Sequence, residues 1–122
     1  MSTLNHCLSQ LAKVQEVVKN IDSAYLFRSR LRRLILSCNR FIAKECGLQE
    51  PNLPTCLALS NDVPPRLKNI AVHCAKLLDL TSTMCQPSEP LDERWRLMWG
   101  SLVGELTTLS QLLVNQQNNT SD

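Results

Sequence analysis

The stretch DSAYLFRSRLRRLILSCNRFIAKECG, residues 22–47, carries two side-chain patterns with the same helical period. Its apolar residues recur at steps of three and four, the spacing that places side chains on one face of an α-helix. A second set, all basic, follows the same rhythm on another face. The apolar set is Leu31, Leu34, Ile35, Cys38, Phe41, Ile42 and Cys46, and the basic set is Arg30, Arg33, Arg40 and Lys44. The first pattern predicts a core face, and the second predicts a positively charged surface.

The remainder of the chain predicts further amphipathic helices that can pack on this apolar face. We expect helices at residues 3–20, 23–46, 63–84 and 89–115. Gly47 should end the second helix, because glycine readily takes the positive φ needed just past a helix end. A long proline-containing crossover loop, 48–62, joins the second and third helices, and 115–122 form a frayed polar tail. The predicted fold is an all-α four-helix bundle, with residues 1–122 as a single domain.

Length and composition agree with an ordinary globular domain. The chain has 122 residues, of which 43% are hydrophobic and 20% charged. Its net charge of +2 is small, so binding to nucleic acid would depend on a local basic patch. No apolar run is long enough to cross a bilayer, and the first residues lack the basic start and apolar block of a signal peptide. We therefore expect a cytoplasmic protein without membrane contact.

Six cysteines raise the question of disulfide bonds. Cys7, Cys38 and Cys74 fall at core positions of the predicted helices, where free cysteine acts as a small buried hydrophobe. Because no export signal is visible, we predict reduced thiols. The alternative is a secreted, cytokine-like helical bundle with three disulfides.

Gly100 and Gly104 lie one turn apart in the predicted fourth helix. Glycine inside a helix costs about 1 kcal/mol relative to alanine. Such a pair therefore indicates a place where another helix approaches closely. Close packing within this chain is the interpretation we prefer, and a homodimer face is the alternative.

Residues 66–73, RLKNIAVH, place a histidine seven residues after an arginine. This arrangement resembles the Arg-x4–6-His motif of the HEPN superfamily, whose members are helical bundles and in many cases metal-independent ribonucleases. The resemblance covers eight of 122 residues, and Lys68 stands before Asn69 where many members carry arginine. It implies that Arg66 would hold an RNA phosphate and that His73 would transfer protons at a dimer cleft.

No other pattern points to chemistry. The chain has no Cys-x-x-Cys pair, no glycine-rich phosphate loop and no nucleophile elbow, so we expect neither a metal nor a cofactor. The first hypothesis is an adaptor or regulatory protein, more plausibly not an enzyme, that binds an acidic macromolecule, a protein before a nucleic acid. The partner-binding residues would be Arg30, Arg33, Arg40 and Lys44, with Arg28 and Arg32 broadening the positive surface. A HEPN-like ribonuclease or an inactive relative is the second hypothesis, and the secreted bundle is the third.

Overall fold

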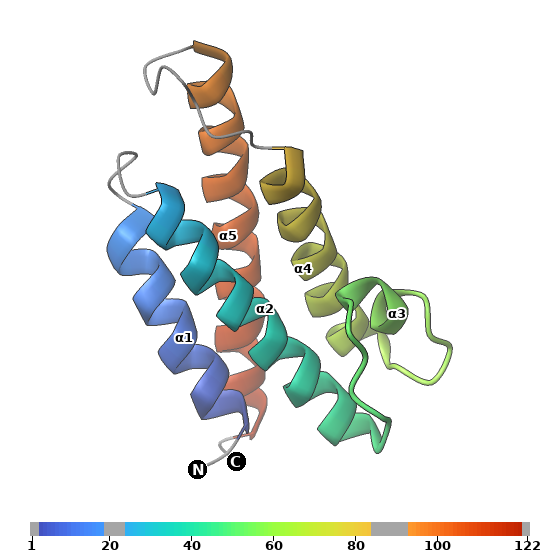
Figure 1. The fold of residues 1–122 in the computed structure, drawn as a ribbon. Coiled ribbons are helices and arrows are strands. Elements are labelled where there is room, and N and C mark those ends of the chain that lie inside the picture. Colours follow the sequence, from blue (N-terminus) through green and yellow to red (C-terminus); the bar gives the residue numbers. More distant parts are fainter. Residues whose placement is uncertain (1–2, 19–23, 84–92, 121–122) are drawn as a thin grey trace.

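Helices make up nearly all of the described chain in a computed structural model of this protein (Figure 1). The structure describes residues 3–18, 24–83 and 93–120, and these ranges contain no strand. The helices are α1 Thr3–Val18, α2 Ala24–Cys46, α3 Pro54–Ala58, α4 Pro65–Thr83 and α5 Glu93–Thr120. The predicted all-α class is therefore confirmed. Within the described ranges, none of the helices has both the length and the apolar character needed to span a membrane.

The four long helices alternate in direction along the chain (Figure 1). α1 contacts α2 and α5, and α4 also contacts α2 and α5, so each long helix has two long neighbours. Their buried apolar side chains form one hydrophobic cluster, to which α3 adds Leu57. α2 ends and α4 begins toward the same end of the molecule. The predicted crossover loop, residues 48–62, connects these neighbouring helix ends and contains α3.

The apolar face of α2 is buried as its spacing predicts. All members of the predicted apolar set are buried except Cys46, which is half-buried. Gly47 has a φ of 65°. The Leu48 N–H donates to the Ala43 carbonyl at 2.8 Å, and the Gly47 N–H donates to the Lys44 carbonyl at 3.3 Å. These two hydrogen bonds are the Schellman arrangement that ends a helix at glycine, so the predicted stop at Gly47 is confirmed.

The start of α4 differs from the sequence expectation, and the expected start of α5 lies outside the described ranges. α4 begins at Pro65, where a missing N–H costs nothing in the first turn. The Pro64 carbonyl accepts hydrogen bonds from the N–H groups of Leu67 and Lys68, so residue 63 precedes the helix. α5 is described from Glu93, and the predicted start at residue 89 lies outside the described residues.

The C-terminal end corrects the predicted frayed tail. α5 remains helical through Thr120, well past residue 115. Gln116 is buried, and its Oε1 accepts a hydrogen bond from Arg66 of α4. One turn earlier, the Gln111 side chain donates to Asn115 at 3.1 Å. The polar sequence gave no sign of this contact with α4, which anchors the last turns of α5.

Candidate functional site

Positive charge is concentrated in α2. This helix holds six cations and one carboxylate, Glu45, whereas the remainder of the chain holds seven cations and ten carboxylates. α2 therefore carries a net charge of +5, and the remainder carries −3. The small net charge of the whole chain hides this separation. A helix with such an excess attracts anionic partners over a distance of about one Debye length.

Arg30, one of the four predicted partner-binding residues, is committed to the contact with α1. Its Nη1 donates to the Lys13 carbonyl at 3.0 Å and to Glu16 Oε2 at 3.3 Å. The Arg30 side chain is 29% exposed, which is consistent with a residue held between two helices. Arg30 therefore joins α1 to α2, and its guanidinium is not free to meet a partner.

The other three predicted residues point to solvent. Arg40 pairs with Glu50 at 3.4 Å, and with side chains 62% and 40% exposed this ion pair is worth at most about 1 kcal/mol. Arg33 and Lys44 are exposed and have no carboxylate partner among the described residues. Ser37, between them, is buried, and its hydroxyl donates to the Arg33 carbonyl at 2.9 Å. The predicted basic stripe is therefore interrupted at Ser37 and partly neutralised at Arg40.

Arg28 and Arg32, which were expected to broaden the positive surface, lie beside another helix, α4. Both are exposed, and both line a hollow of about 500 Å³ between α2 and α4. Neither has an ion pair within the described ranges. The sequence indicated extra charge here, but nothing in it indicated a hollow. We call Arg28, Arg32, Arg33, Arg40 and Lys44 the basic face of α2.

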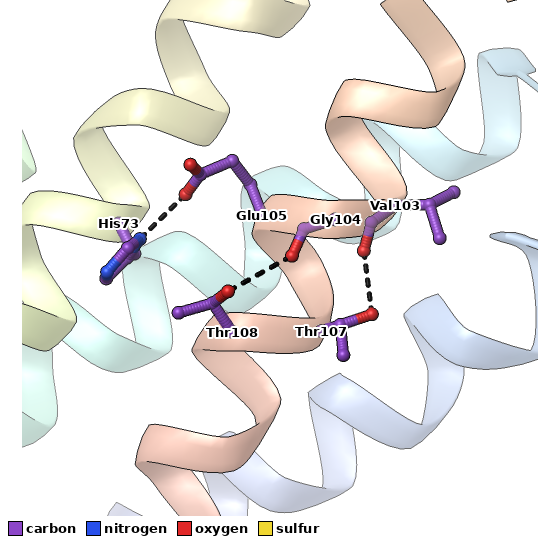
Figure 2. Close-up of polar contacts among 6 residues, drawn as sticks. All are labelled: His73, Val103, Gly104, Glu105, Thr107 and Thr108. Carbon is purple, nitrogen blue, oxygen red and sulfur yellow. Dashed lines mark hydrogen bonds and ion pairs between the residues drawn. The ribbon is translucent and has the colours of Figure 1, made fainter.

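The arginine and histidine of the HEPN-like motif are both engaged by α5. His73 Nδ1 lies 2.7 Å from Glu105 Oε2 (Figure 2), and Arg66 donates to Gln116. No family model, curated protein or solved structure matches this chain. The two acceptors are eleven residues apart on α5, which is roughly 16 Å along a helix. Arg66 and His73 thus serve separate contacts between α4 and α5, and the ribonuclease hypothesis stays a prediction.

Gly100 and Gly104 both lie on an exposed part of α5. A Cβ atom added to either glycine would meet no atom of the described residues within 4 Å. Within these residues, the preferred interpretation, close packing of another helix of this chain, therefore has no support. Beside the glycines, the hydroxyls of Thr107 and Thr108 donate to the carbonyls of Val103 and Gly104 on the same helix (Figure 2). The homodimer face remains a prediction.

Three cysteines meet in the core as predicted. Cys7 of α1, Cys38 of α2 and Cys74 of α4 are fully buried. A hydrogen bond to Cys38, followed by burial, raises the pKa of the Cys7 thiol. For Cys38, the bond from Cys7 lowers the pKa, but the bond to Cys74 together with burial outweighs it and raises the pKa. Such thiols stay protonated and behave as packing groups.

Metal binding has no support in the described residues. They contain no group of three His, Cys, Asp or Glu side chains that could hold a metal ion. Cys85 lies outside the described residues, and the other five cysteines carry no disulfide. The described part of the chain thus offers a basic helix face and a hollow, and these are features of a binding surface.

Proposed function

We propose that this chain is a small cytoplasmic interaction protein, a four-helix bundle that acts as an adaptor or regulator by binding an acidic protein segment through the basic face of α2. One observation carries this proposal. Of the six cations in α2, only Arg30 and Arg40 pair with a carboxylate among the described residues. The remaining four are exposed and unneutralised.

An unneutralised set of this kind has an energetic consequence. Like charges at neighbouring helix positions destabilise a helix by a few tenths of a kcal/mol per pair. Carboxylates from a partner would remove that repulsion and gain Coulomb attraction at the same time. Complementary charge also accelerates the encounter of two proteins and selects among partners. An acidic partner would therefore relieve a repulsion that remains when this surface faces only water.

The character of the exposed side chains favours a protein partner over a nucleic acid. Leu36 of α2 is 44% exposed and lies on the helix among these arginines. A phosphate backbone would leave that leucine unused, whereas an acidic protein segment can cover it with an apolar side chain. Proteins that bind single strands stack bases on aromatic side chains, and the two phenylalanines of α2, Phe27 and Phe41, are buried.

The test measures binding of fluorescent poly-L-glutamate to the full chain at increasing salt. We expect the wild type to bind, with an affinity that falls as salt rises. Arg33→Glu with Lys44→Glu should weaken binding by about tenfold or more, because each reversal replaces attraction by repulsion. The matched control, Lys13→Glu with Arg96→Glu, makes the same charge change outside α2 and should stay within about twofold of the wild type.

Two results would contradict the proposal. Equal weakening by both double variants would mean that only the net charge of the chain matters. Tighter binding of a single-stranded oligonucleotide, dependent on the same α2 residues, would identify nucleic acid as the partner. Thermal unfolding of every variant serves as the folding control, since exposed substitutions should shift stability by no more than about 0.5 kcal/mol.

A further inference from the structure

The hollow between α2 and α4 combines positive charge with apolar surface. Arg28, Arg32 and Leu36 line it from α2, Leu53 lines it from the segment before α3, and Leu78 lines it from α4. Among the described residues, no aspartate or glutamate lines it. Its volume of about 500 Å³ is within the range of ligand pockets. The hollow therefore offers cations and hydrophobic surface to a ligand. No carboxylate of the described residues that line it competes for those cations.

The apolar part of this surface continues along α4. A second hollow of about 550 Å³ shares Leu53 and Leu78 with the first and adds Val72, Ala75, Lys76 and Asp79 of α4. Leu53 is 50% exposed, so part of its side chain is available to a partner. The two hollows together make a groove that is cationic at Arg28 and Arg32 and apolar at Leu53 and Leu78, where they join. The charged pair Lys76 and Asp79 lies in the part that only the second hollow includes. A groove of this kind can take the apolar face of a helix.

The spacing of the two arginines agrees with that of carboxylates on a helix. Arg28 and Arg32 are four residues apart in α2, so their Cα atoms are separated by roughly 6 Å along the helix. Two glutamates at positions i and i+4 of a partner helix have the same separation. Arginine guanidinium groups bind carboxylates with two parallel hydrogen bonds, which makes such a match specific as well as favourable.

Resting on the proposed function, we infer that the partner segment is an acidic amphipathic helix that lies in the groove between α2 and α4. Two of its carboxylates meet Arg28 and Arg32. A leucine-sized side chain beside them covers Leu36, Leu53 and Leu78. Arg33 and Lys44, outside the hollow, steer the approach of the partner and make no direct contact with it.

The experiment uses a fluorescent synthetic peptide of about 18 residues, five helical turns, with glutamate pairs four residues apart and leucines on one face. Binding to the full chain is followed by anisotropy. Arg28→Gln with Arg32→Gln should weaken binding by about tenfold or more. The control, Arg33→Gln with Lys44→Gln, removes the same charge from the same helix and should weaken it by about twofold or less. Leu53→Ser, an independent change of the apolar part, should weaken it by about fivefold.

The possible failures are distinguishable. Equal weakening by the two charge variants would overturn the groove and leave the proposed function intact. Equal affinity for a peptide in which every glutamate is replaced by glutamine would overturn both. A dimer in sedimentation that Arg28→Gln with Arg32→Gln dissociates would identify a second copy of this chain as the occupant and overturn the inference. If that double variant does not fold, Leu53→Ser decides alone, because unchanged affinity there also overturns it.

Discussion

Arg30 and its neighbours Arg28 and Arg32 are the same residue type within little more than one turn of α2, yet their surroundings differ. Toward α1, Arg30 meets Glu16 and the Lys13 carbonyl. Toward α4, Arg28 and Arg32 line a hollow without a carboxylate. The neighbouring helix therefore decides whether an arginine of α2 serves a structural contact or is free for binding. The residue type and its position in the repeat do not decide it.

The two sides of α2 also differ in packing. α2 packs more closely on α1 than on α4, and α1 contributes a continuous row of buried side chains to the contact. On the side of α4, Leu36 and Leu53 remain about half exposed. The α1 side is thus a closed interface, and the α4 side is an open one. Substitutions in the closed and in the open parts of the molecule should therefore have different effects.

The largest effect should come from the closed core. Leu34 is fully buried, whereas Leu36 is 44% exposed. Leu34→Ala should destabilise the protein by about 2–5 kcal/mol, because it removes buried methyl groups and leaves a cavity. Leu36→Ala, the same change two residues away, should cost no more than about 0.5 kcal/mol. Chemical denaturation measures both, and similar losses would show that α2 is not rotated as described.

The buried thiols predict a pH dependence of stability. The pKa values of Cys7 and Cys38 are raised in the folded protein, so folding favours their protonated forms. The stability that this preference contributes is fully present below about pH 8.5, the pKa of a thiol in the unfolded chain. It is lost as pH rises above that value. At pH 10 in reductant, the shifted pKa of each of these two thiols should lower the free energy of unfolding by about 1–2 kcal/mol. Cys7→Ala should lessen the alkaline loss, and Cys56→Ala, an exposed control, should leave it unchanged.

Substitution of a paired and of an unpaired arginine should have different effects on stability. Arg30→Ala removes the contacts with Glu16 and Lys13 and should cost about 1 kcal/mol. Arg33→Ala, on the open surface, should change stability by no more than about 0.5 kcal/mol. Equal effects in urea unfolding would mean that Arg30 is as free as Arg33, and the contrast between the two sides of α2 would not hold.

A change of opposite sign is expected at Asn39, which is fully buried. Neither polar atom of its side chain has a hydrogen-bond partner in the part of the chain that the structure describes. Asn39→Leu keeps the number and branching of the side-chain heavy atoms and removes an amide whose unsatisfied burial is costly, so it should stabilise the protein by about 1 kcal/mol. Destabilisation by the same amount in thermal unfolding would show that the amide is satisfied in solution.

No effect on RNA cleavage is expected from changes at the contact between α4 and α5. Arg66 and His73 are held there by Gln116 and Glu105. Because Gln116 and Glu105 engage Arg66 and His73 at separate positions on α5, purified protein should not cleave RNA, and His73→Ala should change nothing in a cleavage assay. Cleavage by the wild type that His73→Ala abolishes, with folding retained, would establish the HEPN-like hypothesis.

The apolar period and the helix stops were predictable because they are local. Leu34 and Cys38 follow a spacing that a single helix imposes, and Gly47 supplies a backbone conformation that other residues rarely take. Helix ends that depend on distant residues were not predictable in the same way. The last turns of α5 looked like a frayed tail until Gln116 proved to be buried against α4.

The sequence by itself determined the helical class, the inward face of α2 and the presence of an excess of basic residues on that helix. These properties depend on the order of residues along one segment. Only the tertiary structure decided which cations are used internally and where the open surface lies. Arg30 is bound because α1 brings Glu16 to it, and Arg28 and Arg32 are free because, among the described residues, α4 brings no carboxylate into the hollow that they line. The distances between helices set these pairings, and no spacing within one helix encodes them.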